Sequence, residues 1–126
     1  MRRPKVLVVE DEPALAEVLY SNIEGAGYDV VVAPDGLLAL EAYERERPDL
    51  VTLDLRVPTI SGFRLIQLLK RPNGGPPVPV IVVTALSFEE GEEVARYGAD
   101  DYLTKPFDPA DLIARINYLL RDRVVS

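Results

Sequence analysis

The sequence of 126 residues contains no cysteine and no histidine. Without cysteine the chain has no disulfides and no thiolate chemistry, and without histidine it has no imidazole base. The usual zinc sites, which draw on these two residue types, are excluded as well. Any chemistry must therefore rely on carboxylates, hydroxyls, lysine and a hard metal ion.

Positive charge is also in short supply, because 21 acidic residues outweigh 14 basic ones and give a formal net charge of −7. Direct binding to nucleic acid or to a membrane surface is therefore not expected. Long apolar runs are missing too, since the run at residues 6–9 is too short for a signal peptide or a membrane span. We expect one soluble, cytoplasmic domain over residues 1–126, with its core at about 4–121 and a tail or linker start at 122–126.

Four short apolar runs, at residues 6–9, 30–33, 50–53 and 80–83, show no alternation with polar residues. Such runs are typical of strands that are buried on both faces of a parallel sheet. Helical patterns lie between these runs, and residues 101–103 supply a fifth strand. A Pro/Gly-rich stretch at 71–79 is expected to form the loop that leads into the fourth strand. The alternation predicts an α/β fold of three layers, a doubly wound (βα)5 domain with a parallel five-stranded sheet and right-handed crossovers.

The helix beginnings carry capping signals. Pro13 suits the first turn of the first helix, and Asp35 and Asp108 are the predicted N-caps of the second and fifth helices. The apolar residues expected to face the core recur at helical spacing: Leu15, Val18, Leu19 and Ile23; Ala39, Leu40 and Tyr43; Leu65, Leu68 and Leu69; Leu112, Ile113, Ile116 and Leu120.

The fourth helix has the weakest pattern. Ser87 and Glu90 form a capping box at its start, but Gly91 follows inside the helix. We expect this helix to be loosely held, because few apolar residues are available to face a core: Phe88, Val94 and Ala95.

Polar residues stand where the predicted strands end. Glu10 and Asp11 follow the first strand, and Asp54 ends the third. Thr84 ends the fourth strand, and Lys105 follows the fifth. Ligands of open α/β sheets bind beyond the carboxyl ends of the strands, so these five side chains are expected to converge there.

A cluster of three carboxylates calls for a cation, because two carboxylates about 4 Å apart repel by roughly 4 kcal/mol at a surface-like dielectric. Mg²⁺ suits such a site, since it prefers oxygen ligands and keeps waters that a phosphoryl oxygen can replace. Lys105 and Thr84 would donate to phosphate oxygens. Asp54 is then placed to act as a nucleophile that forms an aspartyl phosphate.

Taken singly, most of these residues also have a purely structural interpretation. Asp11 or Glu12 could simply cap the helix that follows the first strand. Thr84 could be an ordinary strand residue and Lys105 a solvated loop residue. Asp54 caps no obvious helix, and the combination of types at the strand ends favours phosphotransfer chemistry.

Together, several motifs resemble the response-regulator receiver family over essentially the whole chain. They are Val-Val-Glu-Asp-Glu at residues 8–12, Leu-Asp-Leu at 53–55 with Pro58, Gly62 and Phe63, Val-Thr-Ala at 83–85, and Gly-Ala-Asp-Asp-Tyr-Leu-Thr-Lys-Pro-Phe at 98–107. The resemblance implies a CheY-like, flavodoxin-like sheet of strand order 2-1-3-4-5. It also implies that a cognate sensor histidine kinase transfers phosphate to Asp54.

The same resemblance implies the metal ligands. Mg²⁺ would be held by Asp11, Asp54 and the main-chain carbonyl of Arg56, with Glu10 acting through a water. Glu10 stands where the family more often has Asp. The Arg56 side chain places a cation at the mouth of the site, where we expect it to affect the lifetime of the phosphoryl group or partner docking.

A switch is implied in the same way. Thr84 would move toward the phosphoryl oxygens, and Tyr102 would rotate inward into the space left behind. These movements would change the face formed by the fourth helix, fifth strand and fifth helix, driven by the added negative charge. The bond between Lys105 and Pro106 would be cis.

The last part of the chain most resembles the OmpR/PhoB-type branch, whose receivers form homodimers through the fourth helix, fifth strand and fifth helix. Asp101 and Arg115 match one interface pair of that branch. Gly91, Arg96 and Asn117 stand where it usually has charges for the other pairs. The sequence therefore supports only part of such a homodimer interface.

The residues favour a phosphoacceptor switch that catalyses only its own phosphorylation and dephosphorylation, and not an enzyme with an external substrate. The alternative is a phosphorylation-independent receiver-like interaction module, which would be favoured if the acidic cluster failed to bind Mg²⁺. Phosphatases that use an aspartyl nucleophile resemble one another in having a second Asp two residues after it. This chain has Arg56 at that position. A flavin carrier would need a phosphate-binding loop after the first strand, where Glu10 and Asp11 would repel phosphate.

Overall fold

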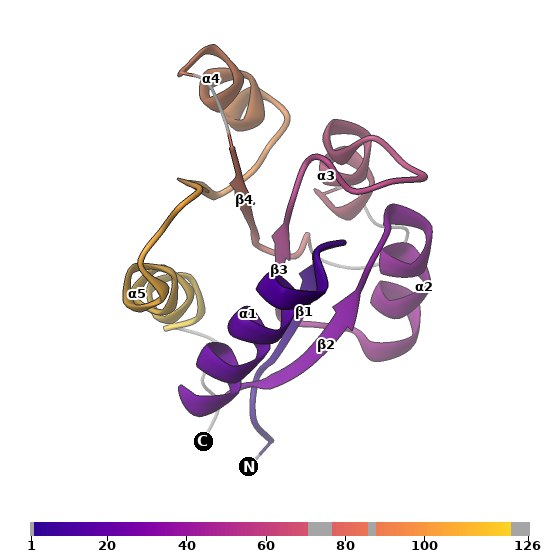
Figure 1. Cartoon of the computed structure of the whole chain (residues 1–126). Coiled ribbons are helices and arrows are strands. Elements are labelled where there is room, and N and C mark those ends of the chain that lie inside the picture. The colour runs from indigo at the N-terminus through magenta and orange to yellow at the C-terminus, as the bar shows by residue number, and fades with distance from the viewer. Residues whose placement is uncertain (1, 71–76, 86–87, 122–126) are drawn as a thin grey trace.

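The structure is a computed structural model that describes residues 2–70, 77–85 and 88–121. Strands and helices alternate along the chain (Figure 1). The strands are β1 (Lys5–Val9), β2 (Asp29–Ala33), β3 (Leu50–Leu53), β4 (Val80–Thr84) and β5 (Asp101–Thr104). The helices are α1 (Pro13–Gly25), α2 (Gly36–Glu46), α3 (Gly62–Lys70), α4 (Phe88–Arg96) and α5 (Pro109–Leu120). None of the described helices is long and apolar enough to cross a membrane.

All five strands form one parallel sheet in the order β2-β1-β3-β4-β5. β3 lies at the centre and pairs with β1 and β4, whereas β2 and β5 are the edge strands. The predicted fold class and strand order are therefore confirmed. The carboxyl end of β3, where Asp54 stands, is flanked by the ends of two other strands.

Helices cover both faces of the sheet (Figure 1), and an apolar core lies on each side of it. Along β1, Leu7 and Val9 enter the core covered by α2, α3 and α4, while Val6 and Val8 enter the core covered by α1 and α5. Burial on both faces explains why the central strands are continuously apolar. The parallel strand order, in turn, determines which strand ends meet at the functional edge.

Burial differs from the sequence expectation at three positions. Val32 is 39% exposed because β2 is an edge strand, so its run of valines is not buried on both faces. Val18 is 45% exposed because α1 turns Leu19 and Ile23 toward the core. Ala95 is exposed because the adjacent Val94 takes the core-facing position of α4.

Two of the predicted N-caps are confirmed. The Asp35 carboxylate accepts a hydrogen bond of 2.8 Å from the Leu38 amide, and the Asp108 carboxylate accepts one of 2.9 Å from the Ala110 amide. Glu12 occupies the N-cap position of α1 but makes no capping hydrogen bond through its side chain. The predicted capping role of Ser87, the first part of the loop at 71–79 and the tail at 122–126 lie outside the described residues.

Candidate functional site

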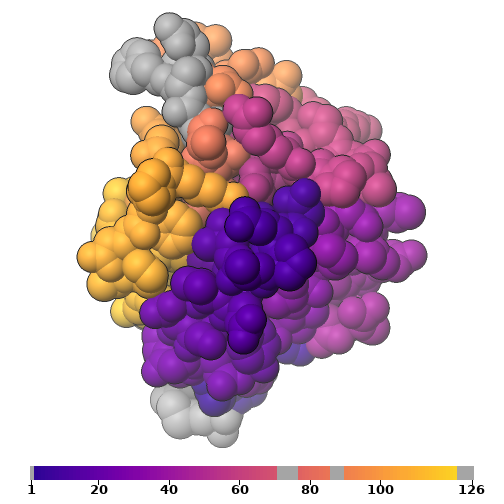
Figure 2. Space-filling model, in the orientation of Figure 1, coloured from indigo at the N-terminus to yellow at the C-terminus, as the bar shows by residue number. Residues whose placement is uncertain are grey.

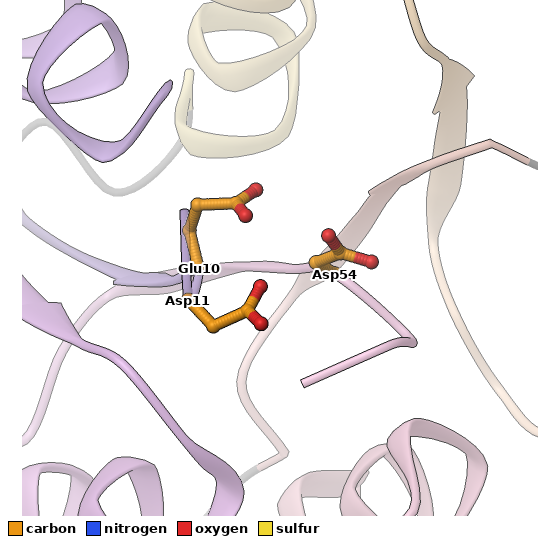
Figure 3. A group of neighbouring side chains, drawn as sticks. All are labelled: Glu10, Asp11 and Asp54. Atoms are coloured by element: carbon orange, nitrogen blue, oxygen red, sulfur yellow. The ribbon is translucent and has the colours of Figure 1, made fainter. Parts of the chain in front are cut away.

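The ends of β1 and β3 bring three carboxylates together. One oxygen from each of Glu10, Asp11 and Asp54 lies within 4.8 Å of the others. Figure 3 shows Glu10 and Asp11 extending from the end of β1 toward the side on which Asp54 lies. Glu10 is 3% and Asp54 is 5% exposed, whereas Asp11 is open to solvent. Two acids are thus removed from water while the third faces it.

The backbone around Asp54 is held on both sides. Its amide donates a hydrogen bond of 3.0 Å to the Val9 carbonyl at the end of β1. Its Oδ1 accepts a hydrogen bond of 2.9 Å from the Arg56 amide. Behind this turn, a Cβ added at Gly62 would lie only 2.4 Å from the Cα of Leu55, so the start of α3 packs directly against the loop. The position of the carboxylate is therefore fixed by main-chain contacts.

Lys105 places a positive charge between the two buried acids. Its Nζ lies 2.8 Å from Asp54 Oδ2 and 3.0 Å from Glu10 Oε1. The Lys105 amide donates to the Thr84 carbonyl at 3.1 Å, which holds the loop after β5 against the end of β4. The bond from Lys105 to Pro106 is cis, as the family resemblance implies.

The ammonium changes the charge balance of the site. Burial acts to raise the pKa of Asp54, but the donors around the carboxylate, led by Lys105, outweigh burial and lower this pKa. For Glu10 burial prevails and raises the pKa despite the hydrogen bond from Lys105. Burial acts to lower the pKa of Lys105, but its hydrogen bonds to the two acids outweigh burial and raise it. Asp54 is therefore ionised at neutral pH, as a carboxylate nucleophile must be.

Thr84 contributes a hydroxyl that is 1% exposed. The hydroxyl helps to lower the pKa of Asp54, yet its Oγ1 has no hydrogen bond of regular geometry to any part of the chain that the structure describes. A buried polar group without a partner costs free energy. Thr84 is thus a ready donor for a group bound beside Asp54.

The Arg56 side chain spans the mouth of the site. Its guanidinium donates to the Ala85 carbonyl at 3.2 Å and lies 4.0 Å from the Glu90 carboxylate. These contacts join the loop after β3 to the start of α4. The sequence indicates a cation at this place, but no local pattern pointed to Ala85 or Glu90 as its partners.

The predicted switch residue Tyr102 and the predicted interface residues Asp101 and Arg115 lie on β5 and α5, while the other switch residue, Thr84, ends β4. Tyr102 is 40% exposed, so its side chain points outward. Arg115 Nη1 lies 2.6 Å from Asp101 Oδ1, and Arg115 also contacts Asp111 at 3.1 Å. The two residues that the family resemblance assigns to a dimer contact are therefore paired with each other inside one chain.

A family model described as the response regulator receiver domain matches residues 6–117. The chain belongs to the response regulator receiver family. Receiver domains are the phosphoacceptor modules of two-component signalling, and that is the function of this chain. The alternative of a phosphorylation-independent interaction module is not favoured.

Curated relatives of this receiver are transcriptional regulators. It is 40% identical over 124 residues to the DNA-binding dual master transcriptional regulator RpaA of Synechocystis sp., with 96% of this chain and 52% of the relative covered. It is 41% identical to the DNA-binding response regulator MtrA of Mycolicibacterium smegmatis, with 94% and 51% covered. The chain thus spans about half the length of the curated relatives it matches.

Solved receiver structures share its fold. The receiver domain of the Francisella response regulator 1452 has a TM-score of 0.88 at 37% identity, with 96% of this chain and 99% of that chain covered. The BeF3-activated N-terminal receiver domain of Klebsiella pneumoniae RstA has a TM-score of 0.85 at 36% identity, with 93% and 98% covered. Receiver domains bind Mg²⁺ at an acidic site, and the all-oxygen donor set of Glu10, Asp11 and Asp54 fits this ion.

Proposed function

We propose that Asp54 is the phosphoacceptor of this receiver. The proposal rests on one arrangement: the buried Asp54 carboxylate is paired with the Lys105 ammonium at 2.8 Å, beside the Thr84 hydroxyl, which has no hydrogen-bond partner among the described residues. An ionised carboxylate with two donors around it suits nucleophilic attack on phosphorus and the binding of the transferred phosphoryl oxygens.

In the proposed reaction a carboxylate oxygen of Asp54 attacks the phosphorus of a phosphohistidine on a sensor kinase. The new oxygen–phosphorus bond forms as the phosphorus–nitrogen bond breaks, and the electron pair returns to the imidazole, which takes up a solvent proton. Hydrolysis then has water attack the same phosphorus, which releases inorganic phosphate and restores the carboxylate. Lys105 and Thr84 donate to the phosphoryl oxygens throughout.

The metal part of the proposal concerns the acidic cluster. Asp11, Asp54 and the main-chain carbonyl of Arg56 would hold Mg²⁺, and Glu10 would act through a water. The bound ion supplies positive charge that offsets the charge of the phosphoryl oxygens. The exposed position of Asp11 supports this assignment, because an ion can reach the cluster from that side.

A groove beside the site is our proposed contact for the kinase. It has a volume of about 460 Å³ and lies between the start of α1 and the loop that leads into α5. In Figure 2 the indigo start of α1 lies next to the yellow-orange segment that contains this loop. Leu15, Val18 and Phe107 supply apolar lining, and Lys105 lines the groove as well. An amphipathic helix that carries the phosphohistidine would fit here, since its apolar face would lie in the groove.

The test is incubation of the chain with acetyl phosphate and Mg²⁺, followed by intact-mass measurement. We expect one added phosphoryl group, lost in Asp54→Asn and lost when a chelator removes Mg²⁺. Asp29→Asn, on the edge strand β2, is the matched control and should still be modified. Failure of the folded, Mg²⁺-exposed chain to gain phosphate would contradict the proposal and support the interaction module.

A further inference from the structure

The ring of Tyr102 lies directly on the backbone of α4 at Gly91. A Cβ added at Gly91 would lie 3.1 Å from Tyr102 Cζ and 3.2 Å from its Cε2 and Oη. Gly91 is buried, while Tyr102 is still 40% exposed. The missing side chain of Gly91 therefore leaves the space in which one side of the ring rests.

Glycine is a poor choice for the interior of a helix, because it lowers helix stability relative to alanine. Gly91 is the fourth residue of α4, which has only nine residues. An isolated glycine is tolerated at such a place, and here the contact with Tyr102 gives it a packing role.

The backbone of Tyr102 is restrained, so its side chain is the part that is free to turn. Tyr102 lies opposite Val82 in the register of β4 and β5. Its amide donates to the Asp101 carboxylate at 2.8 Å, and its carbonyl accepts from Arg115 at 3.3 Å. A change in ring position therefore takes place by rotation of the side chain and not by movement of β5.

We propose that Gly91 is a positioning residue that seats the Tyr102 ring on α4 and so sets the balance between this outward position and an inward one. The proposal rests on the proposed phosphorylation of Asp54 and on the switch role that the family resemblance implies for Tyr102. A methyl group at position 91 would crowd the ring in the outward position that the structure shows. It would therefore raise the inward fraction before any phosphoryl group is added.

A purely structural role for Gly91 predicts something else. In that case Gly91→Ala would stabilise α4 and leave Tyr102 unchanged. The position of the ring is thus the observation that separates the two roles.

The first measurement uses the unsubstituted chain and NMR. We expect nuclear Overhauser contacts between the Gly91 α protons and the Tyr102 ring in the free chain. These contacts should weaken when Mg²⁺ and beryllofluoride, a mimic of the phosphoryl group, are added. Absence of the contacts in the free chain would overturn the proposal.

The second measurement uses Gly91→Ala in chain labelled with 3-fluorotyrosine, with the Tyr102 signal assigned through Tyr102→Phe. We expect the fluorine signal of the unphosphorylated variant to move toward its beryllofluoride position. The rate of modification by acetyl phosphate should rise about fivefold. This factor is at the low end of the effects that one site of a protein has on another. Gly25→Ala is the matched control, because a Cβ there would meet nothing within 4 Å.

A double-variant comparison completes the test. In a Tyr102→Ala background, Gly91→Ala should no longer change the modification rate, because the ring that it crowds is gone. An unmoved fluorine signal, or a rate effect that persists without the ring, would overturn the proposal. Since the NMR readouts need no phosphorylation, they also separate this inference from a failure of Asp54 as acceptor.

Discussion

Arg115 and Asp101 form an ion pair within one chain, with Nη1 of the guanidinium 2.6 Å from Oδ1 of the carboxylate. The same guanidinium contacts Asp111 and the carbonyl of Tyr102. A contact between two copies through these residues would therefore replace existing interactions and add few new ones. Ion pairs at partly exposed positions contribute little even when they are new.

Arg115→Ala should therefore lower the free energy of unfolding by only about 0.5–1 kcal/mol. We expect the sedimentation profile of the chain to be the same for the variant and the parent, both free and with Mg²⁺ and beryllofluoride. Arg45→Ala, which removes an exposed partner of Glu46 on α2, is the control. Loss of a dimer that the parent forms would show that Arg115 does serve an interface.

The charges around Lys105 lead to a prediction about titration. Carbon NMR of the side-chain carboxyls, without Mg²⁺, should give Asp54 a midpoint below its ordinary pKa of 3.8 and Glu10 a midpoint above its ordinary pKa of 4.5. Lys105→Met should raise the pKa of Asp54, because the main opposing charge is gone. Lys70→Met is the control, since the Lys70 ammonium contacts Asp100 outside the site. An unchanged Asp54 midpoint in Lys105→Met would contradict the charge balance described above.

The same pKa shifts fix the sign of the pH dependence of stability. The lowered pKa of Asp54 gives a contribution that is present above pH 3.8 and is lost as the pH falls through the lowered value. The raised pKa of Lys105 also gives a contribution to the stability of the fold, which is present below pH 10.5 and is lost as the pH rises through the raised value. The raised pKa of Glu10 acts in the opposite sense to Asp54, favouring the folded chain below pH 4.5. In urea unfolding near neutral pH, Lys105→Met should lower the free energy of unfolding by about 2 kcal/mol. This value lies between the losses typical of exposed ion pairs and those typical of buried ion pairs.

Asp11 allows the metal site to be tested with little effect on the fold. Because its side chain is exposed, Asp11→Asn should change the free energy of unfolding by less than about 0.5 kcal/mol. Its Mg²⁺ affinity should fall by about tenfold or more, since an anionic ligand is replaced by an amide. Calorimetric titration with Mg²⁺ measures both this variant and the control Asp29→Asn. Equal affinities for the parent and Asp11→Asn would remove Asp11 from the ligand set.

Arg56 is predicted to protect the phosphoryl group. Its guanidinium bridges from the loop after β3 to Ala85 and Glu90, so Arg56→Ala should open the mouth of the site to water. The aspartyl phosphate of the variant should then decay a few-fold faster, as followed by intact mass after acetyl phosphate is removed. Arg64→Ala, on the exposed face of α3, is the control. The same decay rate in Arg56→Ala and the parent would show that the bridge has no protective role.

Gly62 is predicted to be intolerant of any side chain. A Cβ there would lie 2.4 Å from Leu55 Cα and 2.8 Å from the Leu55 carbonyl oxygen, and main-chain atoms cannot easily give way. Gly62→Ala should cost at least about 2 kcal/mol in urea unfolding. Gly25→Ala, with no atom within 4 Å of its new Cβ, should be nearly neutral. A Gly62→Ala variant as stable as Gly25→Ala would show that the loop after Asp54 relaxes freely.

The parts of the fold that depend on local pattern were predictable from the sequence. Burial on both faces of the sheet requires continuous apolar runs, and these runs are visible in the sequence. Asp35 and Asp108 accept hydrogen bonds from amides only a few residues further along the chain, so these helix caps are visible as well. The exposure of Val32 was not predictable from its own run, because it depends on which strand lies at the edge. That information came only from the family resemblance and not from the valines themselves.

Two contacts near the candidate site are non-local. The Arg56 bridge to Ala85 and the seat of Tyr102 on Gly91 each join different elements through particular side-chain rotamers. A one-dimensional pattern records neither the rotamer nor the distance between elements. The sequence therefore indicated a weak fourth helix around Gly91 without indicating what rests on it.

The sheet order has a mechanical consequence. Asp54 follows β3, which is hydrogen-bonded on both sides, whereas Tyr102 stands on β5, which is hydrogen-bonded to a strand on one side only. Local opening of β3 must break two ladders, but opening of β5 breaks one, so the rim of the sheet yields at a lower free energy than its centre. The proposed phosphoacceptor Asp54 thus follows a strand that resists opening from both sides, whereas Tyr102 stands on a strand that opens at a lower free energy.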